Sequence, residues 1–197
     1  MNQAQQQQNI LAQIKQFVTN AMSENDPAHD GNHVHRVVHL TMQLCDAYPQ
    51  ANRFRAELIA WLHDMQDDKL KSNTSETSLA AYLCSLGTSQ EDIRFVLSAL
   101  PYISYRKYPK LSQDVPLEIR IVQDADRIDA MGAIGIARTF AYGGSRGRAL
   151  EESLAHFDEK LLLLYDLLNT QDAKRIAKPR WELLKLFYAN YITESQI

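Results

Sequence analysis

The chain has 197 residues, 45% of them hydrophobic, which fits one domain that can bury a sizeable core. Its formal net charge of −3 excludes the strong overall basic field that favours nucleic-acid binding. The two cysteines, Cys45 and Cys84, lie far apart in apolar patterns, which is typical of reduced cysteines in a cytosolic protein. No apolar run is long enough to span a bilayer, and the start of the chain lacks a signal-peptide pattern. We therefore expect a cytoplasmic protein.

The first half of the chain predicts a series of helices. Residues 1–9 are polar and are expected to fray, and apolar residues at helical spacing then predict a helix that ends near Met22. Polar and proline-containing breaks separate the helices that follow. These are predicted at residues 29–48, 53–63, 75–87 and 88–101, and the last is expected to end at Pro101.

The second half continues the same pattern. A loop at 102–115, rich in tyrosine and basic residues, precedes a helix from Pro116 towards Ala130. The chain then continues as helix to Tyr142 or restarts at Gly132, and residues 143–147 are expected to form a flexible basic loop. Two long helices, at 149–169 and 173–192, complete the chain, and Pro179 is expected to kink or start the last one.

No strand alternation, internal repeat or clear linker interrupts this pattern, so the sequence predicts an all-α, single-domain protein. We expect residues 1–24 to form an N-terminal helix and residues 25–170 to form the main domain. Residues 171–197 are expected to form a C-terminal helix packed on the same domain.

The stretch from Ala60 to Lys69 places His63 and Asp64 at the end of an apolar helix. Adjacent helical residues point about 100° apart, so both side chains can bind one ion only where the helix ends. A polar break at residues 71–75 provides such an end. A core histidine beside a chance acid is the alternative explanation.

The helix predicted at 29–48 directs one histidine into the core. On a helical wheel His33 falls inside the apolar arc, and His29 and Arg36 lie at its edge. His35 and His39 fall on the opposite face, where we expect solvent. His33 is therefore the candidate ligand from this helix.

The helix from Pro116 directs acids inward. Asp126 lies in the middle of its apolar arc and Asp129 lies close by, whereas Asp124 is predicted nearer the outside and Arg127 at an edge. An inward acid costs free energy unless it is paired or bound to a cation. The helix therefore offers a carboxylate to a buried cation.

Three predicted helices thus each point metal-ligand residue types inward, which favours a shared site. The candidate ligands are His33, His63, Asp64 and Asp126. Two imidazoles and two carboxylates suit Mn²⁺, Fe²⁺, Co²⁺, Ni²⁺ or Zn²⁺, and imidazole makes Mg²⁺ a less favoured choice. Four protein ligands on an octahedral ion leave two positions for water and substrate.

The order of these residues resembles the H…HD…D pattern of the HD-domain metal-dependent phosphohydrolases. Longer blocks resemble one bacterial subgroup, which contains uncharacterised hydrolases and a nucleoside-triphosphate pyrophosphohydrolase. The blocks are His29-Asp30-x-x-His33-x-x-Arg36-Val37, Gln123–Ala130 and Gly132–Phe140. The resemblance covers roughly residues 29–165. It implies an all-helical HD bundle, one divalent metal ion and hydrolysis of a phosphate ester or anhydride.

The resemblance also implies roles for residues near the ligands. Asp67 lies one helical turn beyond Asp64, where related nucleotidases carry a carboxylate near the attacked phosphorus, so we expect it to act in acid/base catalysis or to orient water. An ordinary loop acid is the alternative. His29 and Asp30 are expected to orient the ligands or to cap the helix, and Asp129 is expected to lie around the ligands with them.

Basic residues beside the ligands can offset the charge of a phosphate. The first candidates are Arg36, Lys69 and Arg127. Ion pairs with Asp30, Asp64 or Asp129 are an equally good explanation for them. Weaker candidates are Lys107, Arg138, Arg146 and Lys160.

The positions of the histidines limit the chemistry, because none occurs between His63 and His156. Related phosphodiesterases and oxygenases that use two metal ions need further histidines in that interval. One metal ion is therefore expected, and a cyclic-nucleotide phosphodiesterase is disfavoured.

The favoured function is a metal-dependent phosphohydrolase that acts on a nucleotide, preferably as a nucleoside triphosphate pyrophosphohydrolase. A nucleotide- or metal-binding regulator without turnover stays open, as does a phosphomonoesterase or phosphodiesterase of the same superfamily. The tyrosine- and lysine-containing loop at 102–110 could stack on single-stranded nucleic acid, but the patch is short and the chain is acidic overall. We expect a small phosphorylated partner and no membrane, and the sequence leaves a homodimer open.

Overall fold

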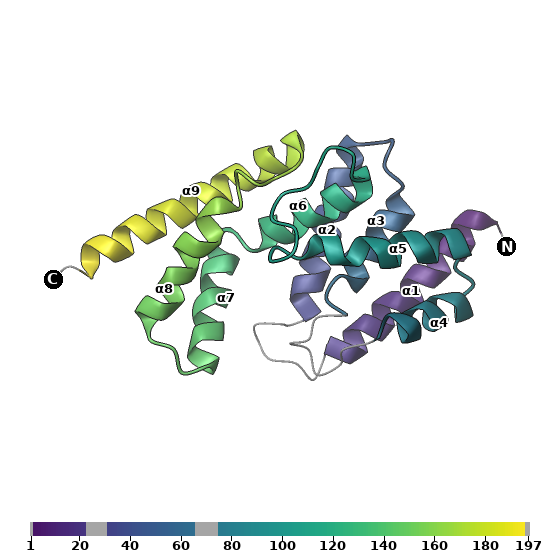
Figure 1. Ribbon diagram of the computed structural model, residues 1–197, viewed down its shortest axis with the longest axis horizontal. Helices are drawn as coiled ribbons and strands as arrows, with labels where there is room; N and C mark the ends of the chain where they lie inside the picture. Colours follow the sequence, from purple (N-terminus) through teal and green to yellow (C-terminus); the bar gives the residue numbers. More distant parts are fainter. Residues whose placement is uncertain (1, 23–30, 66–74, 196–197) are drawn as a thin grey trace.

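The structure is a computed structural model, and it describes residues 2–22, 31–65 and 75–195. Every element within these ranges is a helix, which confirms the all-α prediction (Figure 1). In chain order they are α1 (Gln3–Met22), α2 (Gly31–Ala47), α3 (Arg53–Leu62), α4 (Glu76–Ser85), α5 (Gln90–Ile103), α6 (Leu117–Asp129), α7 (Gly132–Ser145), α8 (Leu150–Glu159), the 3₁₀ turn η2 (Leu161–Leu163) and α9 (Gln171–Glu194).

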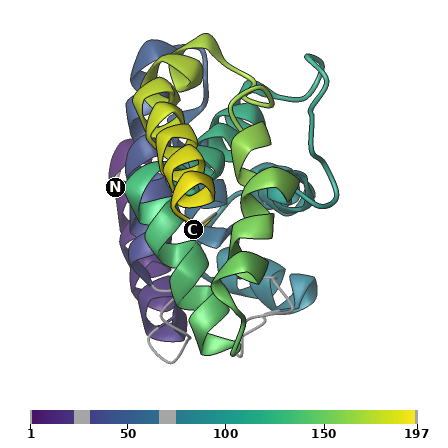
Figure 2. The same cartoon turned by 90° about the vertical axis from the view of Figure 1, so that its left-hand side faces the viewer.

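Helix α6 lies at the centre of the molecule, between two groups of helices (Figure 1). It packs on α2, α3 and α5 on one side and on α7 and α9 on the other. Helices α7, α8 and α9 lie at the opposite end of the molecule from α1 and α4 (Figure 1), and Figure 2 shows these three helices together from that end. Because α2 and α3 pack on each other and on α6, the residues at their ends can meet at one place.

The surroundings of α6 correct two sequence predictions. Asp124 was expected near the outside and Arg127 at an edge, but both are buried. A helical wheel assumes one core side, whereas α6 is covered from several directions. Both groups are paired: the carboxylate of Asp124 accepts hydrogen bonds from Asn169 and Thr170, and the guanidinium of Arg127 donates to backbone carbonyls. These buried polar groups therefore belong to the packing of α6.

The helix starts follow the capping residues in the sequence. The side chains of Asn52, Ser75, Ser89 and Thr170 each accept a hydrogen bond from a backbone N–H in the first turn of α3, α4, α5 and α9. The caps at Ser75 and Ser89 agree with the helix starts predicted at residues 75 and 88, the second to within one residue. Helix α1 begins earlier than expected, at Gln3, where the side chain of Asn2 accepts a hydrogen bond from the N–H of Gln5.

Two of the expected helix boundaries in the middle of the chain are wrong. Helix α5 continues through Pro101 to Ile103, and its buried residues, including Leu100 and Ile103, extend across the proline. Helix α7 continues through Gly143 and Gly144, where a flexible loop was expected. A Cβ atom at Gly143 would lie 2.0 Å from the Oγ of Ser153, so this glycine permits the close approach of α8.

The expected helix at 149–169 is also wrong, because α8 ends at Glu159. The backbone of Lys160 leaves the helical region, and a 3₁₀ turn then brings Leu161 and Leu164 into the core. Helix α9 continues through Pro179, with buried residues on both sides of it. None of the described helices has the length and apolar content that a membrane span requires.

Candidate metal centre

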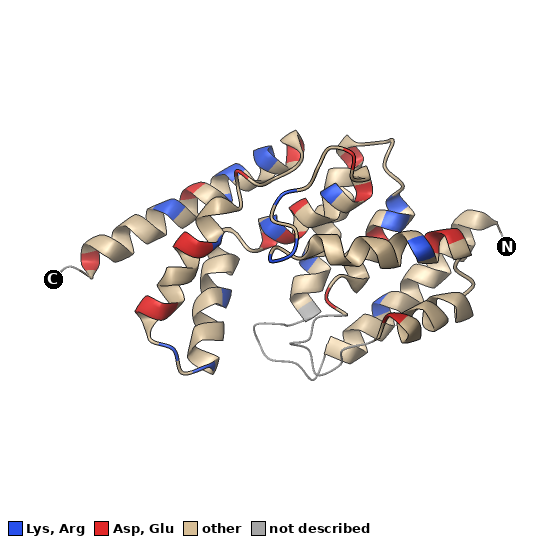
Figure 3. Cartoon of the chain, in the orientation of Figure 1, with Lys and Arg blue, Asp and Glu red and all other residues tan. Residues whose placement is uncertain are grey.

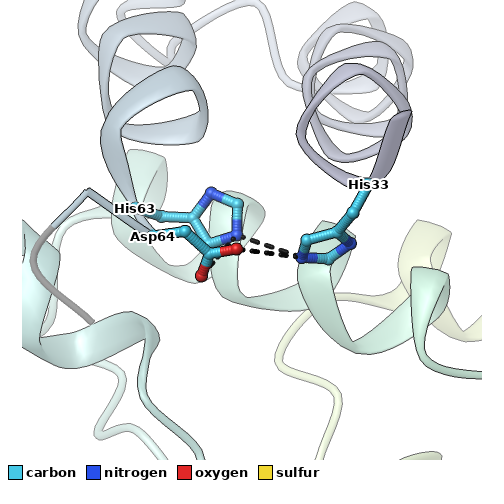
Figure 4. A group of neighbouring side chains, drawn as sticks. All are labelled: His33, His63 and Asp64. Atoms are coloured by element: carbon cyan, nitrogen blue, oxygen red, sulfur yellow. Dashed lines mark hydrogen bonds and ion pairs between the residues drawn. The ribbon is translucent and has the colours of Figure 1, made fainter. Parts of the chain in front are cut away.

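Side chains from two helices converge at one point (Figure 4). His33 comes from the first turn of α2, and His63 and Asp64 come from the turn that follows α3. The Nε2 atoms of the two histidines lie 3.3 Å apart. A carboxylate oxygen of Asp64 lies 3.5 Å from the Nε2 of His33, and the other lies 3.4 Å from the Nε2 of His63. The three residues form a compact group of donor atoms.

A fourth donor comes from α6. The Oδ1 atom of Asp126 lies 3.4 Å from the Nε2 of His33 and 3.9 Å from the Nε2 of His63. The side chain of Asp126 is 27% exposed and that of Asp64 is 21% exposed, so the carboxylates border solvent while the two rings are almost fully covered. The structure therefore brings together all four residues that the sequence selected as candidate ligands.

Hydrogen bonds at the other ring nitrogens determine which atoms face this point. The Nδ1 of His63 lies 2.8 Å from the backbone carbonyl oxygen of Ala60, and the Nδ1 of His33 lies 2.7 Å from the Oδ2 of Asp129. A carbonyl and a carboxylate only accept, so each Nδ1 donates and a neutral ring presents its lone pair at Nε2. Two lone pairs 3.3 Å apart repel unless a cation or a proton lies between them. The donor set therefore fits a bound divalent cation.

The carboxylate of Asp129 lies behind His33 and is completely buried. It accepts two hydrogen bonds from Arg36, at 2.7 Å from Nε and 3.1 Å from Nη2. Arg138, from α7, donates to it as well, at 3.0 Å, and its Nη1 lies equally close to the Nδ1 of His33. Asp129, which the sequence grouped with His29 and Asp30 around the ligands, therefore lies against His33. Buried hydrogen-bonded carboxylates of this kind fix the orientation of a ligating histidine.

The local charges favour a cation at the same place. Burial lowers the pKa of His33, but the surrounding carboxylates, Asp126 and Asp129 first, outweigh burial and raise this pKa to about 9. Burial raises the pKa of Asp126, but the hydrogen bond and charge of His33 outweigh it, and the pKa lies below its ordinary value. The cluster thus holds ionised carboxylates around the two rings, and a positive charge between them is stabilised.

Of the basic residues predicted to contact phosphate, Arg36 lies beside the ligand cluster and Arg127 is buried away from it. Arg36 forms the ion pair with Asp129 that the sequence had left open. The prediction for Arg127 is wrong in its geometry, because its guanidinium donates to the backbone carbonyls of Leu167, Tyr108 and Pro109 and is buried away from solvent. These hydrogen bonds to backbone carbonyls hold the guanidinium inside the protein. Four further predicted site residues, His29, Asp30, Asp67 and Lys69, lie outside the described residues.

Two basic residues that the sequence ranked as weaker candidates, Arg138 and Lys160, lie close to the ligand cluster. Arg138 forms an ion pair with Asp129, the residue that hydrogen-bonds His33. The charge of Lys160 is close enough to lower the pKa of Asp126. The ammonium group of Lys160 also lies 5.2 Å from the centre of the Tyr105 ring. Their positions depend on the packing of α7 and α8, and residue spacing near the ligands gives no signal for them.

Comparisons with known proteins agree with this architecture. A scan against models of known protein families finds no match. The chain is 34% identical over 182 residues to the uncharacterized protein YpgQ of Bacillus subtilis (strain 168), covering 89% of this chain and 88% of YpgQ. It resembles the crystal structure of Bacillus subtilis YpgQ in complex with ADP, with 32% identity, coverage of 96% of both chains and a TM-score of 0.82.

A third similarity is to the crystal structure of an HD-superfamily hydrolase from Bacillus thuringiensis. The identity is 33%, the match covers 96% of this chain and 98% of that one, and the TM-score is 0.77. The identities, the nearly complete coverage and the shared helical architecture together show the family. The chain belongs to the HD superfamily.

Proposed function

We propose that the protein is a divalent-metal-dependent phosphohydrolase that acts on nucleotides. One observation carries the proposal: two histidine Nε2 atoms 3.3 Å apart face the same point as the carboxylates of Asp64 and Asp126. The similarity to an HD-superfamily hydrolase supports hydrolysis as the reaction type.

The protein's own residues would hold and orient the cation. His33, His63, Asp64 and Asp126 would bind it, and the hydrogen bonds to Asp129 and to the carbonyl of Ala60 would keep the two rings in the correct tautomer. When bound, a divalent cation lowers the pKa of a water molecule and polarises a phosphoryl oxygen. We assign Asp67 the task of orienting the attacking water or accepting its proton, because it follows Asp64 by three residues in the sequence.

A nucleotide is the favoured substrate class. The relative YpgQ has a crystal structure in complex with ADP, which supports a nucleotide site in a protein of the same architecture. Arg36 and Arg138 place two guanidinium groups beside the ligand cluster, and each side chain keeps part of its surface exposed. Together with Lys160 they offer enough positive charge for more than one phosphate group. We therefore favour nucleoside triphosphates, cut to the monophosphate and pyrophosphate.

A turnover screen of metals against substrates tests this function. Chelator-treated protein is incubated with Mn²⁺, Co²⁺, Ni²⁺, Zn²⁺ or Mg²⁺ and with nucleoside mono-, di- and triphosphates, and the released products are separated. We expect turnover only with added metal, with Mn²⁺ or Co²⁺ the best activators.

The products distinguish the reactions. Pyrophosphate from a triphosphate supports the proposal, whereas orthophosphate from a monophosphate indicates a phosphomonoesterase with the same centre. The His63→Ala variant serves as the control for contaminating phosphatases. No product from any nucleotide, with metal shown to be bound, contradicts the proposal and indicates a binding protein without turnover.

A further inference from the structure

The stretch at 102–110, which ends α5 and begins the connection to α6, carries three tyrosines among its basic residues. Figure 3 shows the basic part of this connection near the middle of the molecule. The rings of Tyr102 and Tyr108 stack on each other, with centroids 4.5 Å apart. The ring of Tyr105 instead faces Lys160, whose ammonium group lies 5.2 Å from the ring centre. The stretch therefore brings an aromatic ring to a lysine from a distant part of the chain.

Helix α6 holds the backbone of this stretch at both ends. The side-chain amide of Gln123 donates to the carbonyl oxygens of Tyr102, at 2.6 Å, and Tyr108, at 3.0 Å. The guanidinium of Arg127 donates to the carbonyl oxygens of Tyr108, at 3.1 Å, and Pro109, at 2.9 Å. Both side chains of α6 are buried. The backbone before and after the middle tyrosine is thus fixed to the helix that also supplies a ligand to the candidate metal centre.

Lys160 lies directly after α8, where its backbone has left the helical region. The hydroxyl of Tyr105 donates to the backbone carbonyl of the preceding residue, Glu159, at 3.4 Å. Tyr105 therefore contacts this corner of the chain twice, through its ring and through its hydroxyl. The charge of Lys160 also helps to keep the pKa of Asp126 below its ordinary value, so the ammonium group lies on the side of the metal centre that Asp126 forms.

We propose that Tyr105 is a positioning residue, which holds the ammonium group of Lys160 beside the metal centre so that Lys160 binds a phosphate group of the substrate. This inference rests on the proposed function. A lysine side chain loses rotational freedom when it binds a ligand, and a ring that already confines the ammonium group reduces that loss. An aromatic face attracts a cation without neutralising it, whereas a carboxylate at the same place would compete with the phosphate.

Steady-state kinetics of the metal-loaded protein with a nucleoside triphosphate test the inference. Lys160→Met should raise KM about tenfold, because it removes a charged donor to the phosphate. Tyr105→Leu should raise KM about threefold, whereas Tyr105→Phe keeps the ring and should stay near the wild-type value. We expect kcat to change by less than about twofold in each case, since a contact that is equal in the ground and transition states affects KM alone.

The matched control is Lys185→Met, which removes another ammonium group that faces an aromatic ring. This group lies 3.5 Å from the centre of the Trp181 ring, on α9. KM should keep its wild-type value in this variant. Metal content per chain checks that every variant is folded.

A double variant separates positioning from simple packing. If Tyr105 acts through Lys160, Tyr105→Leu should raise KM no further in a Lys160→Met background. If Tyr105 only stabilises the fold, it should change KM by the same factor in both backgrounds. Equal factors, or a loss in Tyr105→Phe as large as in Tyr105→Leu, overturn the inference.

Calorimetric titration with ADP provides a readout that does not need turnover. Lys160→Met and Tyr105→Leu should both weaken ADP binding to the metal-loaded protein. Turnover by the wild-type chain, with KM and ADP affinity unchanged in both variants, overturns this inference and leaves the proposed function intact. Weaker ADP binding in both variants, without turnover in the wild type, supports the positioning role and contradicts hydrolysis. A wild-type chain that neither binds nor hydrolyses a nucleotide overturns both.

Discussion

Two aspartates on α6, Asp124 and Asp126, lie two positions apart and have opposite surroundings. The carboxylate of Asp124 is completely buried and accepts four hydrogen bonds, from the backbone N–H and side-chain amide of Asn169 and from the backbone N–H and hydroxyl of Thr170. The carboxylate of Asp126 borders solvent and faces two imidazole Nε2 atoms. The same residue type on the same helix thus holds the start of α9 in one case and lies in the candidate metal centre in the other.

The difference between them is the number of hydrogen-bond donors that surround the carboxylate. The carboxylate of Asp124 accepts hydrogen bonds from N–H and O–H groups at both oxygens, so it needs no cation to balance its burial. Asp126 faces atoms that are themselves acceptors when the rings are neutral, so a cation is the partner that satisfies all of them. Substitutions in the cluster around Asp126 should therefore reduce metal binding, whereas substitution of Asp124 should reduce the stability of the fold.

The largest effect is expected for His63→Ala. Removing one imidazole from the cluster should abolish stoichiometric metal binding and lower turnover by about 10³-fold or more, since the cation supplies several kcal/mol of transition-state stabilisation. Metal analysis and steady-state kinetics measure both. His39→Ala is the matched control, because His39 is exposed on the far side of α2. Full metal content in His63→Ala contradicts the ligand assignment.

Asp124→Ala should act on stability. It leaves buried donors of Asn169 and Thr170 without an acceptor, so we expect the free energy of unfolding to fall by about 3 kcal/mol. Denaturant titration measures this loss, and metal content per folded chain should stay at the wild-type level. Asp166→Ala, at an exposed position, should change stability by less than about 0.5 kcal/mol. Loss of metal from folded Asp124→Ala protein would remove the distinction between the two aspartates.

Asp67→Asn should lower turnover by roughly 10²-fold while the protein keeps its metal, because Asp67 is proposed to orient the attacking water or accept its proton and is not one of the proposed metal ligands. Kinetics and metal analysis on the same preparation test this pair of results. Normal turnover would identify Asp67 as an ordinary surface acid.

A smaller effect is expected for Asp129→Asn, which weakens the hydrogen bond behind His33 and removes a charge between Arg36 and Arg138. Metal affinity should fall by about 10- to 100-fold, the usual cost of changing the partner of a ligating histidine. Competition with a metal-sensitive dye measures the affinity. Asp172→Asn, which alters an ion pair on α9, is the control and should leave the affinity unchanged.

Much of the site could be predicted from the sequence, because each ligand depends on local rules. His33 follows from the apolar arc of α2, and His63 and Asp64 follow from the polar break after an apolar helix. Arg138 contacts Asp129 only because α7 returns to α6, and the turn between them does not reveal this. The pattern therefore indicated which His and Asp side chains cluster better than it indicated the basic residues around them.

The errors in the fold have a common physical reason. Arg127 and Asp124 were misplaced because a central helix has no single solvent face. Pro101 and Pro179 lie inside helices because buried residues on both sides of each proline hold the helix together. Local propensity therefore gave way to tertiary packing at these positions.

We propose that four side chains, on α2, in the turn after α3 and on α6, hold one divalent cation. Anomalous diffraction at the manganese absorption edge, from crystals grown with Mn²⁺, tests it most directly. We expect one strong peak per chain, within coordination distance of His33 Nε2, His63 Nε2 and carboxylate oxygens of Asp64 and Asp126. No peak at this point, or a peak bound by other residues, would contradict it.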